Sequence, residues 1–395
     1  MAGSESSYEA FLGTRRREGL LRELLAVEAR EARTIRVGDE TLVNFASNDY
    51  LALRFHPGLI ARAREWGERY GAGSGASRLV TGNLSLFAEL ESKVATLKRK
   101  PAALIMASGF QANAAILQAL FDRSVLGAEP LVFADRLNHA SMHFGCAAAG
   151  VRENRYRHGD AAHLAELLIQ YQKVDRPKFI LTESVFSMDG DVAPLAEIEC
   201  LAREHNAMLV VDDAHATGIL GEGGRGLSEG ADIVIGTFSK ALGSFGAYVA
   251  CSEILRDYLV NRCSGLIYST ALPPPALGAI DAALDLLPSL DAERARVAGL
   301  AARLRHGAQS LGFETGASAT QIVPLIAGDN HAALSLGKAL REAGIFATAI
   351  RPPTVPAGTA RVRLAVTAAH TEADIDALLN VLDHHAAMMR VRTAV

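Results

Sequence analysis

The chain has 395 residues, of which 49% are hydrophobic and 21% charged, and its formal net charge at pH 7 is −4. This length exceeds the size at which a single hydrophobic core keeps growing, so we expect two domains, one of them smaller. The balanced charge, without a basic stripe or a lysine run, is typical of a globular protein and argues against nucleic acid as a partner.

The four cysteines form no Cys-x-x-Cys pair and lie in apolar stretches at Cys146, Cys200, Cys251 and Cys263. This pattern predicts reduced core residues, with neither a disulfide framework nor a metal site. Residues 1–20 are polar and charged, unlike a secretion signal, and no apolar run reaches membrane-spanning length. We therefore expect a cytoplasmic protein that does not enter a membrane.

The first two segments of the chain predict an N-terminal arm and a large α/β domain. In the arm, residues 1–45, leucines recur at helical spacing between residues 20 and 25, and a strand-like segment follows over 41–45. In the large domain, residues 46–285, short apolar runs alternate with amphipathic segments of helix length. The runs are 103–106, 131–133, 179–181, 208–211, 233–235 and 247–250. Such runs indicate a mostly parallel sheet covered on both faces.

The third segment, residues 286–395, predicts a smaller α+β domain. Three prolines at 273–275 begin a long helical stretch over 276–290 that leads into it. The pattern then predicts helices over 293–311, 332–343 and 372–389, and strands over 321–326, 345–350 and 361–366. About 100 residues is an ordinary size for a domain.

Polar residues follow four of the apolar runs in the large domain. They are Asp135, Glu183, Asp212 and Thr237. Because ligands of open α/β sheets bind at the carboxyl ends of the strands, these residues predict one shared ligand-binding edge.

Lys240 stands in an apolar setting that is unusual for a lysine. It follows the run 231–236 through Thr-Phe-Ser and is the only lysine between Lys178 and Lys338. A lysine at a strand end either extends to water or carries a reactive amine, and buried lysines form Schiff bases with carbonyl compounds. The polar groups at neighbouring strand ends favour the reactive amine.

Two adjacent carboxylates, Asp212 and Asp213, compete for one role. A carboxylate at a strand end suits a protonated pyridine nitrogen, because the ion pair keeps the ring an electron sink. On a strand the two side chains point to opposite sides, so only one can serve. We choose Asp212, because His215 follows at a spacing that a turn can fold back.

Two glycine-containing segments differ in what they predict. Residues 109–113 open an amphipathic helix after a strand, and backbone amides at a helix N-terminus bind phosphate. Residues 221–226 match G-x-G-x-x-G formally, but no strand precedes them and no helix follows. A dinucleotide fold needs both, so we interpret this segment as a flexible loop.

Five motifs together resemble the α-oxoamine synthases. They are Asp-Asp-Ala-His at 212–215, Thr-Phe-Ser-Lys at 237–240, Ser-Gly-Phe at 108–110, Asp-Arg-Leu-Asn-His-Ala-Ser at 135–141 and Glu-Ser-Val-Phe-Ser-Met-Asp-Gly-Asp at 183–191. Members of this family are acyltransferases of the aspartate aminotransferase-like fold (PLP fold type I). They use pyridoxal 5′-phosphate (PLP) to join an amino acid to an acyl-CoA with loss of carbon dioxide. The resemblance runs from about residue 40 to the C-terminus.

The resemblance implies roles in cofactor binding. Lys240 would bind PLP covalently and, once alanine displaces it, move the α-proton as general base and acid. Asp212 would pair with the pyridine nitrogen, His139 would stack on the ring and His215 would reach its phenolic oxygen. The phosphate side would be held by two side chains and two backbone amides, those of Ser187, Thr237, Gly109 and Phe110.

The resemblance also implies roles in substrate binding. Arg363 would take the amino acid's carboxylate as a bidentate ion pair, with Arg361 as its rival because both arginines face one side of a strand. Arg22 and Thr354 would contact the substrate, and Arg351 would meet the distal carboxylate of a pimeloyl chain.

Residues 349–364 most resemble those members that condense L-alanine with pimeloyl-CoA, or another pimeloyl thioester, in biotin synthesis. Such a protein would be a cytoplasmic homodimer that releases CoA and carbon dioxide. Three alternatives remain: a sister enzyme that uses glycine or serine with another acyl-CoA, a nicotinamide-dependent dehydrogenase built on residues 221–226, and a non-catalytic partner subunit. The joint presence of Lys240 and Asp212 argues against the last. The sequence leaves open whether the partner subunit completes the active site.

Overall fold

The computed structural model describes residues 2–29 and 31–393, which separate into two compact units. The first comprises Met1–Ser47, Met188–Asp191 and Arg296–Val395, and the second Asn48–Ser187 and Val192–Ala295. These units differ from the boundaries expected from the sequence. The arm falls in the same unit as the C-terminal residues, and the later boundary lies at 295/296 instead of 285/286. The reason is strand pairing, because the arm supplies a strand to a sheet of the first unit.

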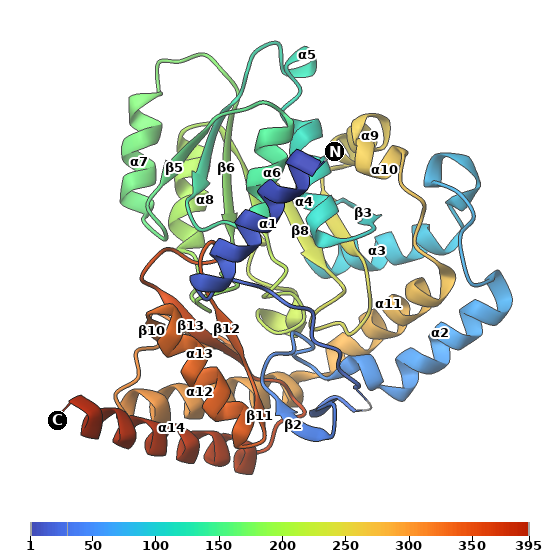
Figure 1. Cartoon of the computed structure of the whole chain (residues 1–395). Coiled ribbons are helices and arrows are strands. Elements are labelled where there is room, and N and C mark those ends of the chain that lie inside the picture. The colour runs from blue at the N-terminus through green and yellow to red at the C-terminus, as the bar shows by residue number, and fades with distance from the viewer. Residues whose placement is uncertain (1, 30, 394–395) are drawn as a thin grey trace. The chain divides into compact units, whose positions relative to one another are not determined.

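The second unit is built on a seven-stranded sheet (Figure 1). Its strand order is β3-β9-β8-β7-β6-β4-β5, and only β9 runs antiparallel to its neighbours. The strands are β3 (Ala102–Met106), β9 (Ala247–Cys251), β8 (Ile233–Thr237), β7 (Ala207–Asp212), β6 (Lys178–Glu183), β4 (Leu131–Asp135) and β5 (Glu153–Tyr156). The mostly parallel sheet predicted from the apolar runs is confirmed.

The sequence missed one strand, β5, at the edge of this sheet. Its residues Glu-Asn-Arg-Tyr are polar, and only the last of them is buried. An edge strand pairs on one side only and needs no continuous apolar run, so hydrophobic pattern alone does not reveal it.

Helices surround this sheet. They are α2 (Pro57–Tyr70), α3 (Leu86–Lys98), α4 (Gly109–Leu120), α5 (Arg123–Leu126), α6 (Ala140–Ala148), α7 (Ala161–Gln170), α8 (Leu195–Glu204), α9 (Glu253–Arg262), α10 (Ser264–Ile267) and α11 (Pro274–Leu286), with shorter turns η1 (Leu53–Phe55), η2 (Arg78–Gly82), η3 (Glu222–Gly224) and η4 (Leu287–Ser289). Apolar residues of α4, α6, α9 and α10 form one core cluster with the strands. Burial of this apolar surface is the main force that holds the sheet and its helices together.

The first unit contains two three-stranded sheets, ordered β1-β2-β11 and β10-β13-β12. Its elements are α1 (Ala2–Arg17), β1 (Thr34–Val37), β2 (Glu40–Asn44), β10 (Ile322–Gly328), α13 (Asn330–Glu342), β11 (Ile345–Phe346), β12 (Thr348–Ile350), β13 (Ala360–Ala365) and α14 (Glu372–Thr393), together with all but the first five residues of α12 (Asp291–Ser310). The predicted strand 345–350 is two strands, because β11 pairs with β2 and β12 pairs with β13.

The predicted helical pattern at residues 20–25 is wrong. The helix of the arm, α1, ends at Arg17, and Gly19 adopts a left-handed φ of 64°. The N–H of Leu20 then donates to the carbonyl of Arg15, which is typical of a glycine-terminated helix. Leu24 is fully exposed, so the spacing of the leucines does not reflect a buried helix face.

One of the four predicted core cysteines is also placed differently, because Cys200 is exposed whereas the other three are buried. All four are free thiols. Within the described residues, no helix combines the length and apolar character needed to cross a bilayer. Nor do three or more His, Cys, Asp or Glu side chains of these residues gather as candidate metal ligands.

Candidate active site

The second unit brings the four polar strand ends to one edge of its sheet. Asp135, Glu183, Asp212 and Thr237 are the last residues of β4, β6, β7 and β8, which are parallel neighbours. All four residues are buried. The register pairs Glu183 with Asp212. A ligand at this edge therefore meets two carboxyl groups side by side.

Asp212 is held by two donors. Its Oδ1 accepts from the N–H of Ala214 at 3.0 Å, and its Oδ2 accepts from the side-chain amide of Asn113 at 2.6 Å. The same Asn113 nitrogen also donates to the Ser141 hydroxyl at 2.9 Å. Since both oxygens act as acceptors, Asp212 has the hydrogen bonds expected of a carboxylate in a fixed orientation.

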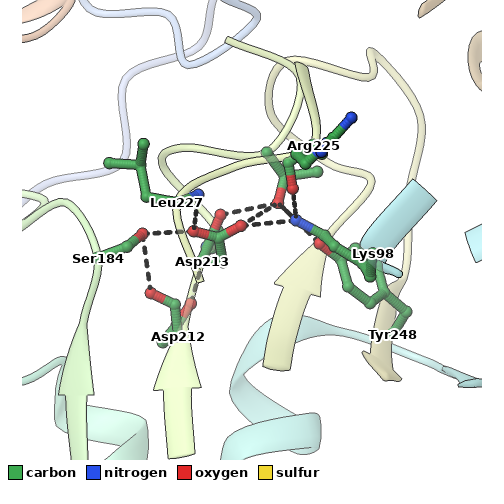
Figure 2. Close-up of polar contacts among 9 residues, drawn as sticks. Lys98, Ser184, Asp212, Asp213, Arg225, Leu227 and Tyr248 are labelled. Atoms are coloured by element: carbon green, nitrogen blue, oxygen red, sulfur yellow. Dashed lines mark hydrogen bonds and ion pairs between the residues drawn. The ribbon is translucent and has the colours of Figure 1, made fainter. Parts of the chain in front are cut away.

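Asp213 points instead into a buried network on the other side (Figure 2). Its Oδ2 lies 2.6 Å from Nζ of Lys98, and its Oδ1 accepts from the Ser184 hydroxyl at 2.6 Å and from the Leu227 N–H at 3.2 Å. Neither partner of the ion pair reaches solvent, since the side chains are 2% and 0% exposed. Both oxygens of Asp213 are therefore bound within this network, and Asp212 is the carboxylate that faces the sheet edge.

The Lys98 ammonium has as many acceptors as it has protons. Besides Asp213 it donates to the Thr217 hydroxyl at 2.8 Å and to the carbonyl of Arg225. Burial lowers the pKa of Lys98, but the charge of Asp213 and the Tyr248 phenol more than offset this, so the pKa is raised. Full pairing is what a buried ion pair requires in order to be tolerated.

The formal G-x-G-x-x-G segment wraps around this ion pair. The carbonyl of Arg225 and the N–H of Leu227 bind Lys98 and Asp213, respectively. Gly226 lies between them with a φ of 90°, and a Cβ there would stand 1.7 Å from Asp213 Oδ2. The segment forms only the short turn η3, and no helix follows it. Gly226 therefore allows the loop to approach the ion pair closely.

His139 lies at the N-terminus of α6 beside the helix α4. Its ring centroid is 6.5 Å from that of Phe110 in an edge-on arrangement, and its Nδ1 lies 2.6 Å from the Ser141 hydroxyl. Although the residue keeps exposed surface, the protein around its ring desolvates it and lowers its pKa. The charge of Asp212 raises the pKa of His139 and the charge of Lys240 lowers it, so both charged groups lie near the imidazole ring.

His215 is buried, and its Nδ1 lies 2.7 Å from the hydroxyl of Tyr50. The hydroxyl of Tyr50 also contacts Asn48 Oδ1 at 3.1 Å. This arrangement fixes the orientation of the imidazole. Sequence reasoning named His215 but not Tyr50, because nothing in the chain links two residues so far apart.

Lys240 is half-buried in the turn that follows β8, where its carbonyl accepts from the N–H of Gly243 at 2.9 Å. Gly109 lies beside Thr237, since a Cβ added to Gly109 would lie 3.9 Å from Cβ of Thr237. The Thr237 hydroxyl donates to the Gly246 carbonyl at 2.8 Å. It also contacts the exposed hydroxyl of Ser239 at 2.7 Å, which sequence reasoning overlooked.

The two arginines of β13, Arg361 and Arg363, lie in the first unit. Arg361 forms an ion pair with Asp189 and donates to the carbonyl of Met188 at 3.3 Å. Arg361 is therefore a structural residue that holds the segment 188–191 in its unit. Arg363 is also buried, on the same side of the strand.

The arm brings together three residues that were named for the substrate. Arg22 donates to the Thr354 hydroxyl at 2.8 Å, and Arg351 donates to the carbonyl of Gly19. Burial lowers the pKa of Arg351, and the charges of Arg22 and Arg15 lower it further. These mutually repelling guanidinium groups form a positive cluster that suits a carboxylate.

Two residues that contact the adjacent aspartates were not assigned a role from the sequence. Asn113, which fixes Asp212, is a lone amide among alanines on a buried helix face, and that contrast is a signal that could have revealed it. Lys98 stands in the basic string Leu-Lys-Arg-Lys, which is typical of a solvated helix end. Lys98 is buried because the loop 221–227 covers it, and no local pattern in the sequence indicates this.

Comparison with known proteins agrees with this geometry. The family model for class I and II aminotransferases matches residues 40–382. The chain belongs to this family.

The chain is similar to an 8-amino-7-oxononanoate synthase from Gluconacetobacter diazotrophicus, with 55% identity over 93% of this chain and 94% of the relative. An 8-amino-7-oxononanoate synthase from Geobacter sulfurreducens is 45% identical over 91% and 93%. Among solved structures, a serine palmitoyltransferase from S. paucimobilis with PLP and myriocin bound has a TM-score of 0.91 at 26% identity, covering 99% of both chains. The resemblance to the α-oxoamine synthases and the aspartate aminotransferase-like fold are confirmed.

The residues of the second unit fit PLP. Asp212 presents a buried, oriented carboxylate for a pyridinium nitrogen, and His139 stands at the same edge. The helix α4 begins at Gly109 next to Thr237, and the first N–H groups of a helix have no partner within it. Such groups bind a phosphate without a cationic side chain.

Proposed function

We propose that this chain condenses L-alanine with a pimeloyl thioester to form 8-amino-7-oxononanoate in biotin synthesis, with release of carbon dioxide and of the thiol that carried the pimeloyl group, which is CoA when pimeloyl-CoA is the donor. The chain is a PLP-dependent acyltransferase that acts on small molecules. The observation that carries the proposal is the 55% identity to an 8-amino-7-oxononanoate synthase over nearly the full length of both chains. The serine palmitoyltransferase of known structure shares the fold at less than half that identity.

Residues of the second unit would hold the cofactor. Asp212 would pair with the pyridine nitrogen, His139 would lie against the ring and His215 would reach the phenolic oxygen. The phosphate would be bound by the side chains of Ser187 and Thr237 and by the amides of Gly109 and Phe110, which begin α4. When bound, PLP supplies an electron sink for the carbanion that forms at the α-carbon of the amino acid.

The chain's own groups would handle the proton and the charges of the substrates. The amine of Lys240 would take the α-proton of alanine as general base and return a proton to the same carbon after carbon dioxide leaves. Arg363 would bind the carboxylate of alanine by two parallel hydrogen bonds. Its rival Arg361 forms an ion pair with Asp189.

The positive cluster of Arg22 and Arg351 would bind the distal carboxylate of the pimeloyl chain, with Thr354 holding Arg22 in place. A chain that ends in a methyl group, as in palmitoyl-CoA, offers no partner for these charges. The cluster therefore favours a dicarboxylic acyl group over a fatty acyl group.

A second copy of the chain would complete the functional molecule as a homodimer. Large apolar side chains are exposed on the arm, among them Tyr8, Phe11 and Leu24, and monomeric proteins rarely expose such groups together. Sedimentation equilibrium is the test, and a mass of one chain at all concentrations would contradict the dimer.

Borohydride reduction followed by peptide mapping tests the site of attachment. The reduced holoenzyme should carry the label on Lys240, and Lys240→Arg should carry none and lose about 10²–10⁴-fold in kcat. The exposed Lys338 supplies the matched control, since Lys338→Arg should keep both label and activity. A label on another residue would refute the assignment.

A panel of substrates tests the reaction itself. Alanine with pimeloyl-CoA should give the highest kcat/KM, and replacing alanine by glycine should lower it about tenfold or more, the discrimination expected for one methyl group. Pimeloyl groups on CoA and on an acyl carrier protein should be compared as donors. Preference for serine with palmitoyl-CoA would establish the sister activity instead.

A further inference from the structure

Glu183 is a buried acid that the mechanism above does not use. It is the register partner of Asp212 on the adjacent parallel strand, and the two residues are 2% and 7% exposed. Register partners of neighbouring strands point to the same face, with backbones about 4.8 Å apart. Two carboxyl groups this close, and away from water, cannot both hold a negative charge at modest energetic cost.

The hydrogen bonds show which of the two holds the proton. Both oxygens of Asp212 accept from N–H donors, those of Ala214 and Asn113, as a carboxylate requires. Oε1 of Glu183 is buried and has no hydrogen-bond partner among the described residues. An ionised carboxylate needs donors at both oxygens, whereas a neutral carboxyl group has fewer acceptor sites to satisfy. The proton of the pair therefore belongs to Glu183.

The charges around Glu183 agree with this assignment. Burial raises its pKa well above the usual value, and Asp212 on β7 raises it further. Lys240, after β8, and the backbone N–H of His139, before α6, lower it, whereas Asp135 on β4 raises it. The lowering influences do not offset burial and the neighbouring carboxylate.

We propose that Glu183 is a positioning residue that stays protonated in the working enzyme and thereby leaves Asp212 as the single anion available to the cofactor's ring nitrogen. An ionised Glu183 would place a second negative charge beside Asp212 and near the Lys240 ammonium. Lys240 must give up its charge to act as a base, so a neutral neighbour suits its role. The inference rests on the proposed use of PLP, but not on the identity of the substrates.

Infrared difference spectroscopy of the holoenzyme tests the protonation state directly. At neutral pH, the spectrum of wild type minus Glu183→Gln should contain the C=O stretch of a protonated carboxyl group, and ¹³C-labelled glutamate should shift this band. Glu153 supplies the matched control in the same unit, because His143 and Arg155 hold its pKa at about 2 against the effect of burial. Wild type minus Glu153→Gln should show carboxylate bands and the amide band of the new glutamine, but no band of a protonated carboxyl group.

Cofactor affinity supplies the second readout. Glu183→Gln should bind PLP within about threefold of wild type, because an amide and a neutral carboxyl group have similar shape and no charge. Glu183→Asp should not substitute as well, because its shorter side chain withdraws the carboxyl group from its place beside Asp212.

The absence of a protonated-carboxyl band that depends on Glu183 would overturn the inference, as would strong loss of PLP from Glu183→Gln. If Glu183→Gln fails to fold, the spectrum of the wild-type protein labelled with ¹³C-glutamate is the test. A protonated-carboxyl band that does not shift with the label would overturn the inference. An enzyme that shows the band but does not use alanine and a pimeloyl thioester would contradict only the proposed function. An enzyme with that activity and no band would contradict only the role of Glu183.

Discussion

At the scale of single residues, two neighbouring aspartates have different tasks because a strand alternates its side chains. Asp212 faces the sheet edge, where Asn113 and a backbone N–H orient it. Asp213 faces Lys98 in a network without solvent. We expect Asp212 to serve the cofactor and Asp213 to serve stability, although the two residues are identical in the sequence.

Substituting these two aspartates in turn should separate the two tasks. Asp213→Asn should lower the free energy of unfolding by about 3–5 kcal/mol, because it leaves the buried charge of Lys98 uncompensated. Asp212→Asn should lower PLP affinity about tenfold or more, since a hydrogen bond to a charged group contributes roughly 1.5–3 kcal/mol. Urea unfolding without cofactor and titration with PLP measure the two effects. Equal losses of stability in both variants would contradict this division.

At the scale of elements, the loop 221–227 closes over the ion pair and requires glycine where it does so. Gly226→Ala would place a methyl group against Asp213 and Lys98 in a left-handed backbone conformation. We expect a loss of stability greater than the roughly 1–2 kcal/mol that a left-handed conformation alone costs a residue other than glycine.

Gly223→Ala is the matched control for this loop. Gly223 is also left-handed, with a φ of 62°, but no atom lies within 4 Å of the added methyl group. Its loss of stability, measured by urea unfolding, should stay near the cost of the backbone conformation alone. If both alanine variants unfold at the same denaturant concentration, the close approach at Gly226 does not matter.

Pairing between distant strands decides the other elements that the sequence left unclear. Nothing in residues 345–350 shows that the first two pair with β2 and the last three with β13. Likewise, the polar residues of β5 form a strand because β4 offers them a free edge. Local pattern predicts strands well only where the strand is buried on both faces.

At the scale of the whole molecule, the residues named for the cofactor all belong to the second unit. A ligand that binds only the folded state stabilises it by mass action, by about 2.7 kcal/mol at a hundredfold excess over its dissociation constant. Removal of PLP should therefore lower the unfolding temperature of the transition that belongs to this unit.

Calorimetry of the holoenzyme and of the protein stripped of PLP measures this effect. Asp212→Asn should show a smaller difference between the two forms, because its affinity for the cofactor is lower. A transition temperature that does not respond to PLP in the wild-type protein would contradict the assignment of the cofactor residues to this unit.

The sequence by itself determined the parallel sheet, the polar residues at its strand ends and the family. These features are local, because apolar runs and short motifs carry them within a few residues. Only the tertiary structure decided that Asp213 is bound by Lys98, that Asn113 fixes Asp212 and that Arg361 is occupied by Asp189. Each of these contacts joins segments far apart in the chain, and a charge or an amide in a sequence does not show which partner the fold will bring to it.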